Sequence, residues 1–483
     1  MAAQGVTPQS EDYSRWYSDV VRMADLAENA PVRGCMIIKP YGYELWENIK
    51  SSLDSRFKAT GHRNAYFPLF IPMSFITKEA EHVEGFTPEL AVVTHGGGKE
   101  LEEPLAVRPT SETVIGHSFS NWIQSYRDLP LLINQWCNVV RWELRPRLFL
   151  RTTEFLWQEG HTAHATEAEA LEHTLRMLDV YADMAINECA IPVIKGLKSQ
   201  QEKFAGAVDS YSIEGMMGNT WALQSGTSHF LGENFSKAFE IQYLDEDNVL
   251  KNVWTTSWGV STRMVGGVIM AHGDDKGLRL PPRIAPYQVV ITPIWKSAED
   301  QETVFSFTKL VEDKLRAVGV RVHVDQREGL SPGFKFNDWE MRGVPVRLEI
   351  GPRDVEGQSV IASRRDTPGR DGKLTLPVDG IASQIGPLLE DIQQTLLQQA
   401  TEFRDSHLHE ASSYDELKEQ VLDGWSLIWH CGTRECEDRI KEETKASSRN
   451  FPLELNEEWS PVGKTCDICG KPAFGKAYFS RAY

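Results

Sequence analysis

Four short clusters of polar and aromatic residues stand out because their side chains could act together in chemistry. They are Arg108–Glu112, Arg141–Glu143 with Phe149–His161, Gln224–His229 and Ser257–Arg263. Guanidinium groups bind phosphate and carboxylate through paired hydrogen bonds, and carboxylates can hold a magnesium ion. No activated serine, cysteine or lysine nucleophile is evident. This combination is typical of phosphoryl or nucleotidyl transfer, which depends on positioning and charge stabilisation.

Three of the arginines, Arg141, Arg151 and Arg263, are expected to converge on an anionic ligand. Arg141 and Glu143 are two residues apart, so on a strand they would share one face. Phe155 offers a flat face for an aromatic base. For any single Arg–Glu pair, an ordinary surface salt bridge is the simpler explanation. Four such clusters in one region of the chain favour a binding site.

Several common catalytic motifs are absent from the sequence. There is no Gly-x-Gly-x-x-Gly after a strand, no His-Glu-x-x-His and no Gly-x-Ser-x-Gly. The run from Gly96 to Lys99 is followed by Glu100, where a phosphate-binding loop needs a hydroxyl group, so we interpret it as a loop tip. The usual dehydrogenase, phosphate-loop and zinc-protease assignments therefore lose support.

The composition is that of an ordinary globular protein. Of 483 residues, 41% are hydrophobic and 25% are charged, which excludes a disordered or collagen-like chain. The net charge of 51 − 69 = −18 disfavours non-specific binding to nucleic acid, so any such contact must be local. No run of about 18 apolar residues is present and the first residues are polar. We therefore expect a cytoplasmic protein without membrane contact.

Changes in residue pattern predict three domains, at 1–280, 281–400 and 401–483. In the first, an amphipathic helix is expected over 167–189 among short apolar runs, which is typical of an antiparallel sheet flanked by helices. In the second, strands and helices alternate, which predicts a small α/β domain with a mainly parallel sheet. The apolar spacing from Ile381 to Leu396 predicts a closing helix. The third domain has only weak periodicity.

Four of the seven cysteines lie in the third domain. Cys431 and Cys436 form one close pair, and Cys466 and Cys469 form another. Two such pairs joined by a loop are suited to a tetrahedral structural zinc site. His430 is an alternative ligand that we disfavour. The other three cysteines, Cys35, Cys137 and Cys189, are expected to be free thiols.

Taken together, the four clusters resemble the class II aminoacyl-tRNA synthetases, and within that class the prolyl-tRNA synthetases of the archaeal and eukaryotic type. Residues 61–68 are similar to motif 1 of the class, which lies at the dimer interface. Residues 141–155 are similar to motif 2, and residues 259–263 to motif 3. The clusters at 108–112, 155–161 and 226–229 are similar to signatures of the proline enzymes. The resemblance covers nearly the whole chain.

The resemblance implies a role for each matching residue. The proline pocket would consist of Thr110, Glu112, Arg141, Trp157, Glu159, His161, Phe204 and His229. The ATP site would consist of Arg141, Glu143, Arg151, Thr152, Phe155, Gln224, Thr227 and Arg263. Arg141, Arg263 and Glu143 would be the catalytic residues, with Arg141 bridging the proline carboxylate and the α-phosphate. Zinc ligands would be Cys431, Cys436, Cys466 and Cys469.

The resemblance also implies the reaction and the partners. ATP with Mg²⁺ would convert L-proline to prolyl-adenylate, and a homodimer would then transfer proline to tRNA(Pro). The fold would combine α/β and α+β domains: an antiparallel-sheet catalytic core, an α/β anticodon-binding domain and a small zinc-binding C-terminal domain. Arg327, Glu340 and Arg347 are candidates for reading anticodon bases. Only 102 positions separate Phe155 from Ser257, which leaves no room for a large editing insertion.

Two alternatives remain open at this stage. The first is a threonyl- or histidyl-type specificity within the same class, which the proline signatures disfavour. The second is a catalytically silent RNA-binding relative. Intact Arg141, Glu143 and Arg263 argue against it, because a binding protein has no need of all three.

Overall fold

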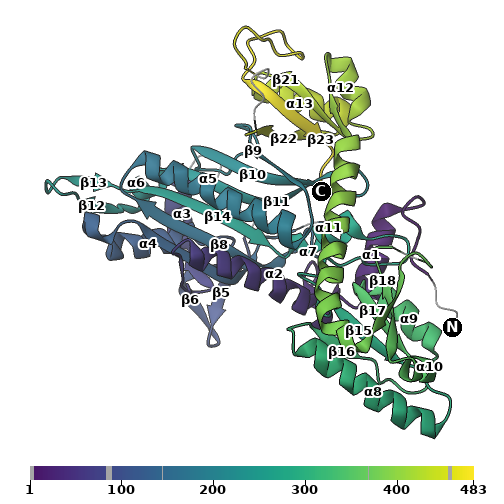
Figure 1. Cartoon of the computed structure of the whole chain (residues 1–483). Coiled ribbons are helices and arrows are strands. Elements are labelled where there is room, and N and C mark those ends of the chain that lie inside the picture. The colour runs from purple at the N-terminus through teal and green to yellow at the C-terminus, as the bar shows by residue number, and fades with distance from the viewer. Residues whose placement is uncertain (1–4, 83–89, 144, 368, 455–459) are drawn as a thin grey trace.

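The computed structural model describes residues 5–82, 90–143, 145–367, 369–454 and 460–483. Its main feature is an eleven-stranded sheet that spans the first and last parts of the chain (Figure 1). The first part supplies seven strands, in the spatial order β9 (Val193–Leu197), β10 (Asp209–Met216), β11 (Ala222–Gly232), β14 (Trp254–Ser261), β8 (Glu154–His164), β7 (Leu131–Val140) and β3 (Arg63–Asn64). Only β3 and β7 pair in parallel among these seven strands. The predicted antiparallel core is confirmed.

Helices bury apolar side chains against this sheet. Helix α5 begins after a capping box at Thr166 and packs on β11 and β14, and a short π-helical turn, η2, follows it. The four helices of this layer and the turn are α1 (Tyr13–Met23), α2 (Pro40–Ala59), α5 (Glu167–Asp183), η2 (Met184–Glu188) and α7 (Arg263–His272). Trp16, Trp46 and Trp258 are fully buried in the resulting core. The helix predicted over 167–189 is thus confirmed.

Smaller elements extend the first region. A three-stranded sheet, β4 (Phe70–Pro72), β6 (Lys99–Val107) and β5 (Val92–Gly96), packs with α3 (Met73–His82), α4 (Glu112–Trp122) and α6 (Asn234–Phe239). Two hairpins, β1 (Ala27–Asn29) with β2 (Met36–Ile38) and β12 (Gln242–Leu244) with β13 (Leu250–Asn252), and the 3-10 turn η1 (Tyr126–Asp128) complete it. The run from Lys99 onward is the start of β6, and Gly97 and Gly98 form its turn as expected.

The second region is built on a five-stranded sheet in the order β16 (Val322–Val324), β15 (Val289–Pro293), β17 (Val346–Ile350), β18 (Ser359–Arg364) and β19 (Lys373–Pro377). Its helices are α8 (Ala298–Arg316), α9 (Pro332–Met341), α10 (Pro352–Glu356) and α11 (Ile381–Ser406), with the 3-10 turn η3 (Val378–Gly380). β15 pairs in parallel with β16 and β17, whereas β18 and β19 run antiparallel. The predicted mainly parallel sheet is thus mixed: two of its four strand pairings are parallel and two are antiparallel.

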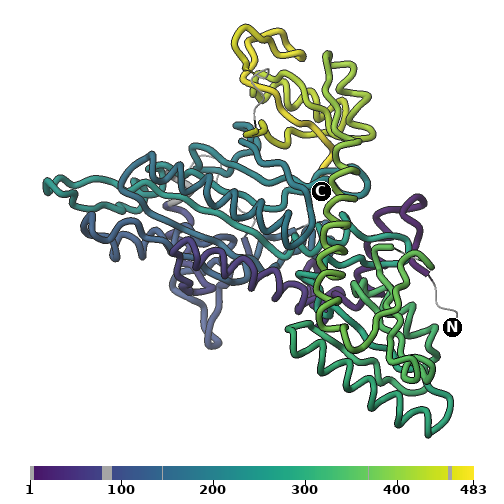
Figure 2. The backbone as a smooth tube through the Cα atoms, viewed as in Figure 1, coloured from purple at the N-terminus to yellow at the C-terminus, as the bar shows by residue number. Residues whose placement is uncertain are grey.

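The third region joins the eleven-stranded sheet directly. Strands β20 (Leu408–Glu410), β21 (Trp425–His430), β23 (Gly475–Ser480) and β22 (Ser447–Pro452) continue it, and helices α12 (Tyr414–Gln420) and α13 (Arg434–Thr444) flank them. The junction is the pairing of β22 with β9. Helix α11 runs across residue 400 and leads from the five-stranded sheet to this region (Figures 1 and 2). None of the described helices combines the length and hydropathy that a bilayer span requires.

Close packing between β8 and β14 makes Gly160 a sensitive position. Gly160 lies opposite Trp258 in the ladder, and a Cβ atom at this glycine would overlap the buried indole ring. We expect Gly160→Ala to lower the free energy of unfolding by about 1–3 kcal/mol through overpacking.

Thermal unfolding would measure this change. The matched control is Gly333→Ala in the first turn of α9, where a Cβ atom meets open space. That substitution should leave the unfolding temperature unchanged or raise it, because alanine favours the helix over glycine by up to about 1 kcal/mol. An equal loss for both variants would contradict this account of the packing.

Candidate active site

Two neighbouring cavities open at the face where the sequence clusters meet. The first, of about 400 Å³, lies over β8, β11 and β14. Its walls contain all eight residues predicted for a proline pocket, together with eight more. The eight further residues are Pro109, Lys198, Glu202, Gln224, Thr227, Ser257, Trp258 and Gly259. The structure therefore brings together residues from the four sequence clusters and from a fifth segment, 198–204.

The second cavity, of about 290 Å³, is lined by arginines and aromatic side chains. Its residues are Arg141, Glu143, Phe149, Leu150, Arg151, Thr152, Phe155, Ser261 and Arg263. Six of the eight residues predicted for ATP lie here, whereas Gln224 and Thr227 line the first cavity. Among the lining residues of these two cavities, Arg141 is the one that both share.

Arg141 follows directly after the end of β7. The strand ends at Val140, so Arg141 and Glu143 are not strand residues, but both line the second cavity. The Arg141 backbone N–H donates to the Thr153 carbonyl at 2.8 Å, and its Nε donates to the Pro109 carbonyl at 2.9 Å. These two bonds fix the side chain without neutralising its charge.

Aromatic rings complete the setting of Arg141. Its guanidinium lies 5.1 Å from the ring centre of Trp157 and 5.5 Å from that of Phe155, within the range of a cation–π interaction. The side chain reaches solvent through the open mouth of the cavities, yet the surrounding protein limits its hydration and lowers the pKa of Arg141 from its ordinary value. Arg141 therefore remains a cation that lacks full hydration.

Arg263 is the first residue of α7, immediately after β14. Its Nε donates to the Leu150 carbonyl at 3.1 Å. Burial, and then repulsion from Arg151 and Arg141, lower the pKa of Arg263 to about 10. Glu143 offsets part of this charge, with an oxygen 3.6 Å from Nε of Arg151. The second cavity thus holds more positive than negative charge, which is the electrostatic requirement for an anionic ligand.

A buried hydrogen-bond network supports the floor of the first cavity. Glu159 accepts from the Ser111 hydroxyl at 2.5 Å, from Gln135 at 2.9 Å and from the Ser111 backbone at 3.1 Å. The Cys137 thiol also donates to one of its oxygens at 3.4 Å, and Nε2 of His161 lies 3.0 Å from the other. Burial opposes charge on both groups, but the bond between them prevails, lowering the pKa of Glu159 and raising that of His161. Glu159 is therefore a carboxylate already engaged by the protein.

Glu112 differs from Glu159 in its surroundings. Among the described residues it accepts a side-chain hydrogen bond from the Thr110 hydroxyl alone, and it is nearly buried in the wall of the first cavity. A buried carboxylate requires compensation by a positive charge. Glu112 thus keeps capacity for a cationic ligand group, and Glu202 is a further carboxylate in the lining of this cavity.

The opposite wall of the first cavity is formed by His229 and Phe204. Their ring centres are 4.8 Å apart, and Nδ1 of His229 lies 2.8 Å from the Ser210 hydroxyl. Burial, together with the charges of Lys198 and Arg141, lowers the pKa of His229 to about 3, so this imidazole is neutral at physiological pH. These two rings are therefore a flat, uncharged part of the cavity lining.

Sequence reasoning gave no role to several lining residues. Ser257 and Gly259 belong to a cluster that the sequence singled out, and their places on β14 follow from it. Lys198 and Glu202 lie in an irregular segment that carries no periodic signal. Lys198 donates from Nζ to the Gln224 side chain at 2.6 Å, so its role depends on a contact that sequence spacing does not reveal.

The anticodon candidates do not all meet. Glu340 and Arg347 line a third cavity of about 410 Å³ in the second region, with Arg364, Arg365, Arg370 and Lys373 also in its walls. Arg327 is not among its lining residues. It is held by Asp325 at 2.7 Å and by Asp338 at 2.8 Å, so its charge is satisfied within the protein.

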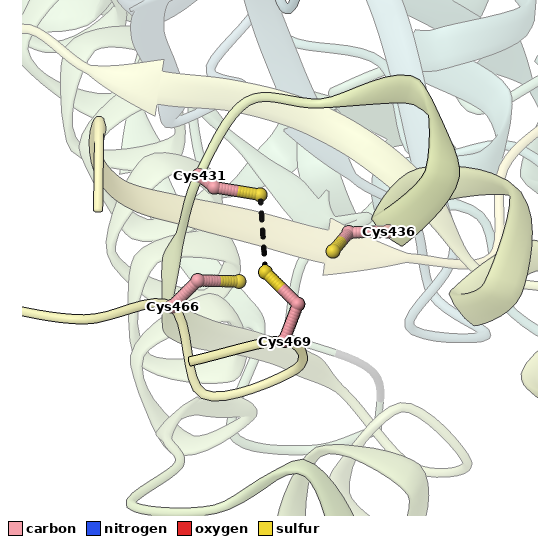
Figure 3. Close-up of side chains that lie close together, drawn as sticks. All are labelled: Cys431, Cys436, Cys466 and Cys469. Atoms are coloured by element: carbon pink, nitrogen blue, oxygen red, sulfur yellow. Dashed lines mark hydrogen bonds between the residues drawn. The ribbon is translucent and has the colours of Figure 1, made fainter. Parts of the chain in front are cut away.

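The four C-terminal cysteines converge as predicted from their spacing. Figure 3 shows their side chains directed toward one common point. All four sulfur atoms lie within 4.8 Å of one another, and those of Cys431 and Cys469 are 3.8 Å apart. His430 accepts a hydrogen bond from the Gly432 backbone through Nδ1, and it is not part of this group. All seven cysteines are free thiols.

Comparison with known proteins now identifies the class. Residues 92–272 match the model of the tRNA synthetase class II core domain (G, H, P, S and T), residues 288–385 that of an anticodon binding domain, and residues 414–483 that of the prolyl-tRNA synthetase C-terminal region. The sheet and the arginine-lined cavities are thus those of a class II aminoacyl-tRNA synthetase. The chain belongs to the prolyl-tRNA synthetase family.

Relatives along the whole chain support this assignment. A proline–tRNA ligase of Symbiobacterium thermophilum is 56% identical, with 99% of this chain and 98% of that protein aligned. A chloroplastic/mitochondrial proline–tRNA ligase of Arabidopsis thaliana is 53% identical over 99% of this chain and 88% of its own length. A crystal structure of prolyl-tRNA synthetase from Cryptosporidium parvum complexed with halofuginone and AMPPNP superposes with a TM-score of 0.94, at 40% identity and 99% coverage of both chains.

The Glu159–His161 pair makes a testable statement about pH. Because the pKa of His161 is raised, its contribution to stability is complete below about pH 6.5 and is lost as the pH rises through the folded-state pKa. Because the pKa of Glu159 is lowered, its contribution is present above about pH 4.3 and is lost as the pH falls through the folded-state pKa. The stabilisation should therefore be largest between these limits.

Burial lowers the pKa of His161, and the Glu159 carboxylate raises it. Replacing Glu159 with glutamine removes that carboxylate and leaves the effect of burial. We expect the pKa of His161 to fall from above its ordinary value to below it in Glu159→Gln. A proton NMR titration of the imidazole, assigned with His161→Gln, would measure this. An unchanged titration would show that Glu159 does not hold the proton on His161.

Proposed function

We propose that this chain joins L-proline to tRNA(Pro) at the expense of ATP, as its relatives' names state for them. The observation that carries the proposal is the junction of the two cavities at Arg141, one cavity with aromatic walls and a carboxylate, the other lined by three arginines. Proline is small and largely apolar but carries a charged secondary amine and a carboxylate. A cavity pair of this kind suits an amino acid held next to a nucleotide phosphate.

The first cavity is assigned to proline. Its eight predicted residues remain Thr110, Glu112, Arg141, Trp157, Glu159, His161, Phe204 and His229. In this proposal Glu112 and Thr110 receive the amine, because Glu159 is already bonded to Ser111, Gln135 and His161. Glu159 then acts by holding His161 in place. The rings of Trp157 and Phe204 exclude water from the apolar side of the substrate.

The second cavity is assigned to ATP with Mg²⁺. Arg151, Arg263 and Arg141 would bind the phosphates, and Phe155 would stack on adenine, with Thr152 and Glu143 nearby. Gln224 and Thr227, in the first cavity, would approach the ribose side of the junction. Magnesium accompanies ATP as part of the substrate complex and neutralises phosphate charge. Glu143 is the carboxylate among the lining residues of this cavity.

Two displacements would follow. An oxygen of the proline carboxylate forms a bond to the α-phosphorus of ATP, the α–β phosphoanhydride bond breaks, and pyrophosphate leaves. Arg141 and Arg263 stabilise the negative charge that develops on the phosphate oxygens. A ribose hydroxyl at the 3′ end of tRNA(Pro) then attacks the carbonyl carbon of the adenylate, and AMP leaves. The carboxylate is already a nucleophile, so the first step needs no strong general base.

The tRNA would be read at a distance from this site. Glu340 and Arg347 remain candidates for anticodon recognition, because both line the third cavity. The Arg347 guanidinium lies 4.2 Å from the ring centre of Phe336 and pairs with Glu349 at 3.0 Å. Arg327 is a weaker candidate, since two aspartates already bind it. Edge hydrogen bonds and stacking are the means by which unpaired bases are read.

The remaining predictions concern assembly. We propose the division into domains at 1–280, 281–400 and 401–483, a cytoplasmic location and the archaeal and eukaryotic subtype.

We also propose that the protein is a homodimer. Support for the dimer comes from exposed apolar side chains in and near β3 and β4, namely Tyr66, Phe70 and Trp122. Light scattering should give twice the mass of one chain, and a monomer at micromolar concentration would contradict the proposal.

Amino-acid-dependent exchange of pyrophosphate with ATP, measured without tRNA for all twenty amino acids, tests the activity. We expect exchange with proline alone. Exchange with threonine or histidine would show that the site accepts a different amino acid. No exchange, with or without tRNA, would favour a catalytically silent RNA-binding relative.

Glu112→Gln should raise the KM for proline about tenfold or more, since the substitution removes the negative charge opposite the proline amine.

The segment between β8 and β14 leads to a second prediction. It consists of α5 with η2, the strands β9 to β11, the short helix α6 and the hairpin of β12 and β13, with no additional domain among its described residues. A pocket that accepts proline discriminates against a smaller apolar amino acid by only about 1–3 kcal/mol per methylene. We expect tRNA mischarged with alanine not to be hydrolysed by this chain. Release of free alanine from alanyl-tRNA(Pro) by the purified protein would overturn this.

We further propose that the cysteine cluster binds a structural zinc ion. A tetrahedral site with Zn–S bonds of about 2.3 Å requires sulfur atoms about 3.8 Å apart, which the four cysteines approach. Four protein ligands leave no open position, so the metal would stabilise the fold without taking part in the reaction.

Elemental analysis should find one zinc per chain, and Cys436→Ser should lose the metal and unfold at a lower temperature. Cys35→Ser, outside the cluster, should keep it.

A further inference from the structure

One wall of the first cavity is a loop without regular secondary structure. Residues 198–208, here called the pocket loop, connect β9 to β10, and three of them line the cavity: Lys198, Glu202 and Phe204. A loop of this kind has few ladder hydrogen bonds to fix it, so its shape depends on specific contacts. The question is which contacts hold these three side chains in place.

Within the loop, Ser199 is the residue on which the turn is built. Its carbonyl accepts from the Lys203 N–H at 2.9 Å and from the Glu202 N–H at 3.2 Å. Its hydroxyl oxygen accepts from the same Glu202 N–H at 3.3 Å. Further along, the Phe204 N–H donates to the Ser210 hydroxyl at 3.0 Å. The position of Ser199 therefore sets where Glu202 stands.

Ser199 is itself held by the C-terminal region, 238 residues further along the chain. Its hydroxyl donates to the Glu437 carboxylate at 3.0 Å, and both side chains are buried, at 2% and 4% exposure. Next to it, Nε2 of Gln201 donates to Asp438 at 2.8 Å. Two consecutive acidic residues of α13 thus hold the first turn of the pocket loop.

The base of the loop is joined to the same region. β22 pairs with β9 at Phe451–Leu197 and Pro452–Gly196, so the ladder between the two regions ends one residue before the loop begins. On the neighbouring strands, Arg449 and Glu214 form a buried ion pair at 3.1 Å. The loop therefore leaves the sheet at a point that the C-terminal region fixes.

The cysteine cluster lies directly behind these contacts. Cys436 precedes Glu437 in the first turn of α13, and its sulfur is directed toward those of the other three cysteines (Figure 3). Whatever holds the four sulfur atoms together therefore also holds the turn that carries Glu437 and Asp438. By contrast, no residue of the pocket loop lines the second cavity.

From these contacts we propose that the cysteine-bearing C-terminal region positions the amino-acid pocket, with Glu437 and Asp438 acting as positioning residues for the pocket loop through Ser199 and Gln201. This proposal rests on the assignment of the first cavity to proline. It predicts that loosening the contact weakens binding of the amino acid and leaves the nucleotide site intact. The C-terminal region then contributes to substrate binding without touching the substrate.

Two readouts test the proposal together. The first is hydrogen–deuterium exchange of peptides covering 198–208 in the full chain without substrates, which does not depend on the activity. The second is the KM for proline and for ATP in pyrophosphate exchange. In Glu437→Ala and in Ser199→Ala, we expect faster exchange of the loop peptides, a KM for proline raised about tenfold, and a KM for ATP within twofold of the unsubstituted chain.

The controls separate positioning from general damage. Glu437→Gln retains an oxygen that accepts from Ser199, so it should restore the KM for proline. Glu442→Ala changes an exposed glutamate of the same helix and should alter neither readout. The double variant Ser199→Ala, Glu437→Ala should have a KM for proline no higher than that of the more strongly affected single variant, because each single substitution already removes the same hydrogen bond. Zinc content should be unchanged throughout.

The outcomes are distinct from those for the activity itself. If the unsubstituted chain shows no proline-dependent exchange, the proposed function fails, whereas loop protection that depends on Glu437 would still support the positioning contact. Unchanged loop protection in Glu437→Ala would overturn the inference. An equal rise of the KM for proline and for ATP would overturn it as well, because that pattern indicates damage to the whole fold.

Discussion

The position of one guanidinium group determines how the rest of the site can work. Arg141 stands between two cavities, and the bond from its Nε to the Pro109 carbonyl holds it there without consuming its charge. A partner carboxylate would have satisfied the cation and left nothing for a ligand. Because a carbonyl and two aromatic rings surround it, Arg141 stays available to two anionic groups at once, one from each cavity.

The need to leave charge available for ligands also accounts for the other charged groups of the site. Glu159 and His161 neutralise each other beneath the first cavity, whereas Glu112 keeps capacity for a cation. Burial, and then repulsion from the other two arginines of the second cavity, lower the pKa of Arg263. Arg449, by contrast, is buried in an ion pair with Glu214 outside the two cavities. The site leaves charge uncompensated, and a zwitterion and a polyphosphate together would supply what is missing.

Much of this could be predicted from the sequence, for physical reasons. Most of the site residues lie in short local clusters on or next to strands of the large sheet, so these clusters carried most of the information, and all eight residues predicted for proline line one cavity. The cysteine spacing likewise predicted the cluster. Other features could not be predicted from local sequence patterns. Alternation identifies a strand but not its direction, so the pattern predicts a mainly parallel sheet, whereas β17, β18 and β19 pair antiparallel. Lys198 and Glu202 depend on contacts with distant residues, and Arg327 is neutralised by Asp338, which local spacing did not reveal.

The most direct test of the shared role of Arg141 is to measure the affinity of the purified protein for proline and for AMPPNP separately, by calorimetry, in the unsubstituted chain and in Arg141→Ala. If Arg141 serves both cavities, both affinities fall in the variant while its unfolding temperature stays the same. A loss of affinity for only one of the two ligands would contradict this, and would mean that the cavities meet at Arg141 without sharing it.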